Sequence, residues 1–128
     1  MNPSAVSTIP LFAPVSRRHR DDVACLVDEV EVPAGVRLTR QGGYAQEFFV
    51  VVAGAAEVFR DGEHVAALRD GDFFGEVGLL GAGWTRSASV VAASPMRLLV
   101  LARREFRDLL ARFPEVAAPI VRAAAERA

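Results

Sequence analysis

The sequence predicts a mainly β domain with flanking helices, in the order helix, β-barrel, helix, helix. Residues 33–102 contain short β-branched runs separated by turn signals, a texture typical of a sandwich or barrel. On both sides of this region, apolar residues recur at the three- and four-residue spacing of a helix face. With 128 residues, the chain has the length of a single domain spanning 1–128.

The N-terminal helical part is predicted at 11–32. Ser16 is a suitable N-cap, and it follows Pro14, which breaks the entering chain. The buried face of this helix is predicted from the i, i+3, i+4, i+7 spacing of Val23, Leu26, Val27 and Val30. The single cysteine, Cys25, is expected at a core position of the helix and cannot form an intrachain disulfide.

Turn signals divide the barrel region into short strands. We expect these strands at 36–40, 48–52, 55–59, 64–68, 87–92 and 96–101. The dipeptide Asp61-Gly62 favours a two-residue hairpin, because glycine tolerates a positive φ.

Two helices are predicted in the last part of the chain, 103–128. The first has an apolar face made of Phe106, Leu109, Leu110 and Phe113, and Pro114 ends it. The second is expected from Glu115, with an apolar side made of Val116, Ile120, Val121 and Ala124. Pro119 lies inside it and removes a main-chain hydrogen bond, so we expect a kink or a later helix start.

Charge and composition argue against several classes of protein. A net charge of −1 gives no electrostatic reason to expect nucleic acid or an anionic membrane as a partner. The longest apolar run, 48–56, is far too short to span a bilayer, and the N-terminus lacks the order of a signal peptide. We therefore expect a cytoplasmic location, with membrane contact only as part of a larger membrane protein.

The segment 72–90 carries two charges in unusual surroundings. It reads DFFGEVGLLGAGWTRSASV, with Glu76 in a glycine-flanked turn and Arg86 among small polar residues. Gly75 would let the backbone approach a ligand, and the free N–H groups of the next turn would form an anion site. Arg86 offers a planar fork for two phosphate oxygens, whereas Glu76 accepts hydrogen bonds from hydroxyls such as those of a ribose. An anion and a sugar hydroxyl together indicate a nucleotide.

This segment resembles the phosphate-binding cassette of the cyclic nucleotide-binding domain family. It reads Phe74-Gly75-Glu76-Val77-Gly78-Leu79-Leu80 and then Arg86-Ser87-Ala88-Ser89, a spacing similar to that of bacterial catabolite activator proteins. The similarity extends over most of the chain, from Leu11 to Pro114. It implies a double-stranded jelly-roll with a short cassette helix, and a regulatory sensor that is not an enzyme and needs no cofactor.

The resemblance also implies a role for each residue of the phosphate site. Arg86 would bind the exocyclic phosphate oxygens. The backbone N–H groups of Gly75 and Ala88, with the hydroxyl of Ser87, would complete the phosphate shell.

The rest of the ligand is assigned in the same way. Glu76 would bind the ribose 2′-hydroxyl, Val58 would contact the base, and the last helix would close over the base as a lid. We favour cAMP over cGMP, because cAMP is the commoner bacterial messenger in this family. The effector that the domain regulates and its oligomeric state are left open.

Several alternatives remain at this point. Glu76 and Arg86 would form a structural salt bridge with each other, or the domain would be degenerate and serve as a protein–protein interaction module. A cupin-like metalloenzyme is a weaker alternative, because the sequence has only two histidines, His19 and His64, and no third ligand stands out. Trp84 is expected to pack in its loop and not to stack on a base.

Overall fold

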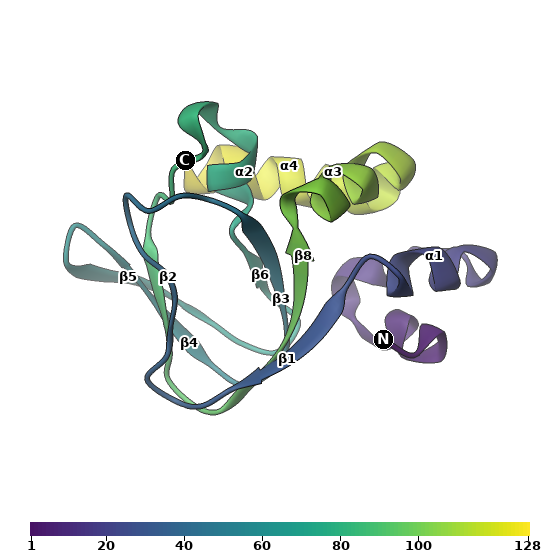
Figure 1. The fold of residues 1–128 in the computed structure, drawn as a ribbon, viewed down its shortest axis with the longest axis horizontal. Coiled ribbons are helices and arrows are strands. Elements are labelled where there is room, and N and C mark those ends of the chain that lie inside the picture. The colour runs from purple at the N-terminus through teal and green to yellow at the C-terminus, as the bar shows by residue number, and fades with distance from the viewer.

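Two four-stranded antiparallel sheets form the body of the molecule, and the helices lie along one side of it (Figure 1). The computed structural model describes residues 1–128, apart from the side chain of Ala82. The first sheet contains, in order, β1 (Asp28–Val32), β8 (Met96–Ala102), β3 (Glu47–Ala53) and β6 (Phe73–Phe74). The second contains β2 (Arg37–Thr39), β7 (Ser89–Ala92), β4 (Ala56–Arg60) and β5 (Glu63–Leu68).

These sheets confirm the mainly β class with flanking helices but not a closed barrel. In the described residues, no strand of one sheet pairs with a strand of the other, so the arrangement is a jelly-roll sandwich. The predicted hairpin at Asp61-Gly62 joins β4 and β5, and both residues have a positive φ, 54° and 80°. That pair of angles matches the turn type whose twist fits two antiparallel strands.

The helices fall into three groups along the chain. Before the sheets come η1 (Pro3–Thr8), η2 (Pro10–Phe12), η3 (Arg17–His19) and α1 (Arg20–Ala24). Between β6 and β7 lie α2 (Glu76–Leu80) and η4 (Ala82–Trp84). After the sheets come α3 (Arg103–Arg112) and α4 (Pro114–Arg127). Along the described chain, no helix combines the length and the apolar character that crossing a bilayer needs.

Strand β3 is buried on both faces. Phe48 and Val50 point to a core shared with the helices, whereas Phe49 and Val51 point to a second core between the two sheets. Successive side chains of a strand point to opposite faces, so burial on both faces requires an uninterrupted apolar run. This accounts for the lack of alternating polar residues at 48–52.

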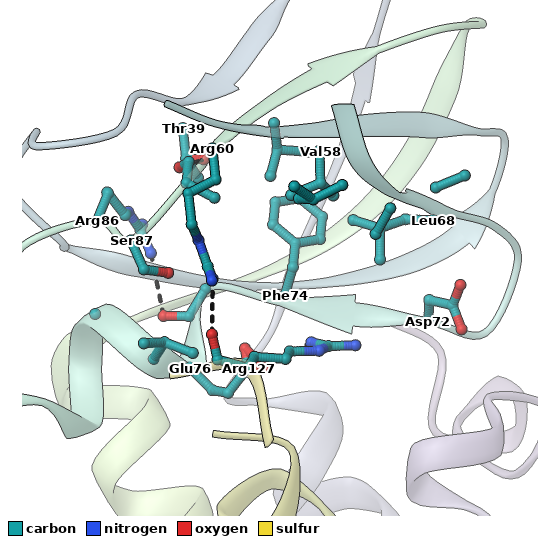
Figure 2. Close-up of a pocket in the computed structure, with 18 residues that line it drawn as sticks. Thr39, Val58, Arg60, Leu68, Asp72, Phe74, Glu76, Arg86, Ser87 and Arg127 are labelled. Carbon is teal, nitrogen blue, oxygen red and sulfur yellow. Dashed lines mark hydrogen bonds and ion pairs between the residues drawn. The ribbon is translucent and has the colours of Figure 1, made fainter. Parts of the chain in front are cut away.

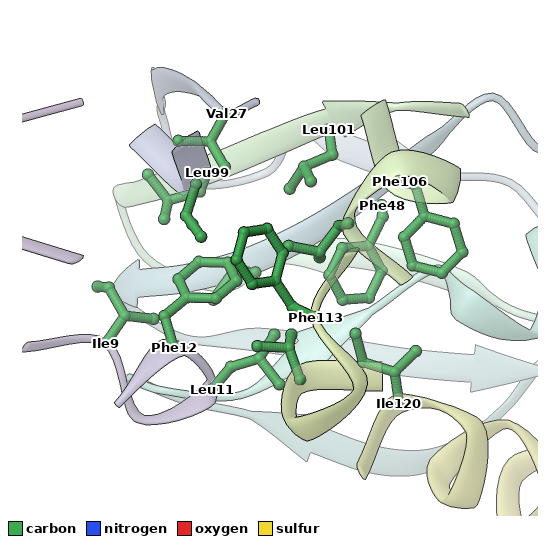
Figure 3. Packing of buried hydrophobic residues seen from close by; sticks show 14 of the residues in the cluster. Ile9, Leu11, Phe12, Val27, Phe48, Leu99, Leu101, Phe106, Phe113 and Ile120 are labelled. Atoms are coloured by element: carbon green, nitrogen blue, oxygen red, sulfur yellow. The ribbon is translucent and has the colours of Figure 1, made fainter. Parts of the chain in front are cut away.

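The helix-side core joins the N-terminal and C-terminal helices to the first sheet (Figure 3). The ring of Phe48 lies 4.7 Å from that of Phe106 on α3, and Phe12 and Ile120 are fully buried in the same cluster. Burial of such aromatic and branched side chains stabilises the fold by roughly 1.5–3 kcal/mol each. The helices are therefore part of the hydrophobic core.

The predicted N-terminal helix is much shorter than expected. Helix α1 ends at Ala24, and Asp28–Val32 forms strand β1, in which Val30 pairs with Leu98 and is 37% exposed. The sequence of this strand, DEVEV, alternates with the period of two that is typical of a strand, although Val30 also fits the helical spacing. Pairing with β8 favours the strand over the helix. Cys25, the C-cap of α1, is exposed and does not occupy the expected core position.

Helix α4 begins at Pro114 and continues through Pro119. A later helix start is therefore wrong. Its buried residues are Val116 and Ile120, and Val121, which was expected on the apolar side, is 53% exposed.

The neighbouring residues Ile120 and Val121 test how α4 packs. We expect Ile120→Ala to lower the free energy of unfolding by about 2–5 kcal/mol, since a buried side chain is truncated. The matched variant Val121→Ala should change it by less than about 0.5 kcal/mol. Urea unfolding followed by circular dichroism measures both values. Equal losses would contradict the observed orientation of α4.

Candidate functional site

A cavity of about 500 Å³ lies between the second sheet, helix α2 and the end of α4 (Figure 2). It brings together all six residues that the sequence predicts for the site: Val58, Gly75, Glu76, Arg86, Ser87 and Ala88. They come from strand β4, from the start of α2 and from the segment before β7.

Gly75 makes close packing possible at the entry to α2. Its φ is +99°, and a Cβ built there would lie 2.9 Å from Nη1 of Arg86 and 2.9 Å from the carbonyl oxygen of Glu47. Any other residue would therefore face both an unfavourable backbone conformation and a clash. Glycine at this position lets the Arg86 side chain lie against the main chain.

Arg86 is a buried cation that is held by backbone carbonyls. Its side chain is only 6% exposed, and it donates from Nη1 to the oxygen of Gly75 (3.1 Å) and from Nη2 to that of Glu47 (2.7 Å). Burial lowers the pKa of Arg86, and the negative charges of Glu47 and Glu76 offset part of this effect. Among the described residues it forms no ion pair, so the guanidinium, which has five N–H donors, can still bind an anion.

Glu76 is 1% exposed, yet its carboxylate belongs to the cavity wall. Its Oε1 accepts a hydrogen bond of 2.5 Å from Nη1 of Arg127, at the end of α4. The partner of Glu76 is thus Arg127 and not Arg86, so the structural salt bridge between Glu76 and Arg86 is wrong.

The rest of the cavity wall is largely apolar. Strands β4 to β7 contribute Val58, Val65, Leu68, Phe74 and Val90. Thr39 also lines the cavity, but its hydroxyl donates to the carbonyl oxygen of Ala88 (3.0 Å) and fixes the backbone there. One end of the cavity therefore carries charged groups, whereas its other walls suit a flat apolar ring.

Two cavity residues, Arg127 and Arg60, were not found from the sequence. Nη1 of Arg127 donates to Glu76 and to the carbonyl oxygen of Phe73 (2.8 Å). Nη2 of Arg60, on β4, donates to the carbonyl oxygen of Arg127 (2.7 Å). In the sequence both look like surface charges, since no local pattern connects them with the cassette.

Trp84 lies outside this cavity. Its ring packs against the guanidinium of Arg103, with 3.9 Å between Cζ and the ring centroid, which confirms that it packs in its loop. Among the residues that the structure describes, no group of three or more His, Cys, Asp or Glu side chains is arranged to hold a metal ion.

Comparison with known proteins agrees with this geometry. The profile of the family described as "Cyclic nucleotide-binding domain" matches residues 29–113. A cyclic nucleotide-gated potassium channel of Rhizobium etli is 34% identical over 122 residues, which are 95% of this chain and 34% of the channel. A cAMP-dependent protein kinase regulatory subunit of Emericella nidulans is 33% identical over 80% of this chain and 25% of its own length.

A solved structure shows the same likeness. The catabolite activator protein of Thermus thermophilus superposes with a TM-score of 0.79 and 32% identity, covering 92% of this chain and 57% of that protein. The chain thus spans about a third of the length of the first of these curated relatives and a quarter of the second. The family profile covers most of the described fold, including the whole cassette, and so the chain belongs to the cyclic nucleotide-binding domain family.

Proposed function

We propose that this chain binds a cyclic nucleotide in the cavity, prefers cAMP to cGMP, and acts as a regulatory sensor in the cytoplasm. The observation that carries the proposal is the buried guanidinium of Arg86, which faces the cavity without an ion-pair partner among the described residues. A cation in such a place is costly unless an anion compensates it. Domains of this family are regulatory and not catalytic.

The cyclic phosphate is the proposed partner of Arg86. Arg86 donates to its exocyclic oxygens, and the hydroxyl of Ser87 and the N–H groups of Gly75 and Ala88 surround it. Support comes from the position of all four residues on the cavity wall. The hydroxyl of Ser87 also makes no hydrogen bond to another described residue. Hydrogen bonds to charged groups contribute roughly 1.5–3 kcal/mol each.

Glu76 and Val58 complete the proposed ligand contacts. Glu76 accepts from the ribose 2′-hydroxyl through Oε2, because Oε1 is engaged by Arg127. Val58 packs against the base. The cavity, at about 500 Å³, falls within the range of sites for small molecules.

The proposed preference for cAMP has two supports. The relative from Emericella nidulans is named a cAMP-dependent protein. The wall beside Val58 consists mainly of aliphatic side chains, with Arg60 as its charged member, and adenine brings fewer hydrogen-bonding groups to such a surface than guanine does.

Transmission is proposed to run through helices α3 and α4. Arg127 and Arg60 tie the last turn of α4 to the cassette and to β4, across the cavity. A nucleotide that contacts Glu76 adds to this closed arrangement and shifts the population of conformations toward it. The effector, a domain or protein of unknown identity, then responds to the position of the helices.

Calorimetric titration with cAMP and cGMP tests the binding. We expect micromolar or tighter binding, which corresponds to about −8 kcal/mol, with cAMP preferred. Arg86→Ala should weaken it by about 2–5 kcal/mol, as for the removal of one partner of a buried charge pair. The matched variant Arg69→Ala, at an exposed arginine, should bind like the parent. If a folded chain binds neither nucleotide, the sensor proposal fails and the interaction module takes its place.

Hydrogen exchange of α4 tests the transmission. Saturating cAMP should slow amide exchange in the last turns of α4, because closure protects them. Arg127→Ala should abolish much of this protection, whereas Arg122→Ala, an exposed neighbour on the same helix, should keep it. If the amide exchange rates in α4 of the parent chain are the same with and without cAMP, closure of this helix is not the signal.

A further inference from the structure

A cluster of aromatic and arginine side chains lies outside the cavity, where the cassette loop meets the first turn of α3. The guanidinium of Arg103 lies over the ring of Trp84, 3.9 Å from Cζ to the centroid, and 5.1 Å from that of Tyr44. Its Nη2 also donates to the carbonyl oxygen of Ala45 (2.5 Å). Arg103 thus contacts two chain segments that are far from it in sequence.

Trp84 needs such contacts because its backbone is strained. Its φ is +49°, a conformation that is uncommon for residues with a bulky side chain. Strain of this kind persists only where the surroundings hold it in place, and it concentrates near functional sites. Here the ring is held by Arg103, and the carbonyl oxygen of Trp84 accepts from the N–H of Ala45 (2.7 Å).

The strained residue lies two positions before Arg86. The N–H of Arg86 donates to the carbonyl oxygen of Gly43 (2.8 Å), and its own carbonyl oxygen accepts from Gly42 (2.9 Å). Segments 42–45 and 84–86 therefore form a short backbone ladder, which also includes a bridge between Tyr44 and Thr85. Arg103 contacts both segments of this ladder: Trp84 in one and Ala45 in the other.

We infer that Arg103 is a positioning residue for the nucleotide site. By holding Trp84 and Ala45 together, it fixes the backbone from which Arg86 enters the cavity, and it joins the cassette loop to α3. Arg103 does not line the cavity and touches no proposed ligand atom. The inference rests on the proposed function only in taking Arg86 as the phosphate ligand.

Neighbouring arginines on α3 provide matched controls. Arg104 is exposed, and Arg107 lies farther from the Trp84 ring, at 5.6 Å. Arg104→Ala removes the same charge one residue away without removing the stack. A general effect of charge would therefore appear in Arg104→Ala as well.

Intrinsic fluorescence reports on the contact directly, because Trp84 is the single tryptophan of the chain. In the protein without nucleotide, Arg103→Ala should increase quenching of Trp84 by acrylamide, since the ring loses its cover. Arg104→Ala should leave quenching unchanged. Equal quenching in the parent chain and Arg103→Ala would overturn the inference.

Calorimetry with cAMP then separates positioning from general damage. Arg103→Ala should weaken binding about three- to tenfold, because the cation–π contact and the hydrogen bond that it removes exist with or without the nucleotide, and only their effect on the position of Arg86 reaches the affinity. In a Trp84→Gly background the same substitution should have a much smaller effect on affinity, because glycine adopts a positive φ without strain and only the hydrogen bond to Ala45 is left to lose. Arg103→Lys, which keeps the cation but not the planar fork, should show a smaller loss and serves if Arg103→Ala does not fold.

Two results would overturn the positioning role: an unchanged affinity in Arg103→Ala, or a full loss that persists in the Trp84→Gly background. If the parent chain binds neither cAMP nor cGMP, the proposed function itself fails, and the role of Arg103 in binding fails with it. The quenching experiment keeps these cases apart, because it detects the contact between Arg103 and Trp84 without any nucleotide.

Discussion

The burial of the Arg86 guanidinium is the constraint on which the rest of the site depends. Removing an arginine from water is costly, and the backbone carbonyls of Gly75 and Glu47, together with the nearby charges of Glu47 and Glu76, offset part of this cost. Those carbonyls reach the guanidinium because residue 75 has no side chain and because β3 begins beside it, at Glu47. The position of one cation thus links the start of α2, the start of β3 and the backbone ladder of residues 42–45 with 84–86.

The same region connects the cavity with the helices. Helix α2 carries Glu76 on the cavity side, and Glu76 is paired with the last turn of α4. Helix α4 in turn packs through Val116 and Ile120 into the core that contains α3. Charged contacts at the cavity and apolar contacts in the core therefore meet on one helix.

Features that depend on residues close together in the sequence could be predicted, whereas those that depend on contacts between distant residues could not. The cassette residues lie within one short segment, and their types and spacing sufficed to place them together. Strand β1 was missed because Val23, Val27 and Val30 also fit a helical spacing, and only its pairing with β8 decides the matter. Arg127 was missed because it lies 51 residues from Glu76, and no local pattern records a contact across that distance.

The burial of β3 on both faces separates the effects of neighbouring substitutions. Phe49 stacks on Phe74, a residue of the cavity wall, with ring centroids 4.7 Å apart, whereas Phe48 packs on Phe106 beneath the helices. Adjacent positions of one strand therefore belong to different cores: residue 49 packs between the two sheets, and residue 48 packs between the first sheet and the helices. A substitution at residue 49 is therefore expected to disturb the packing behind the cavity wall, and one at residue 48 the packing of helix α3 on the first sheet.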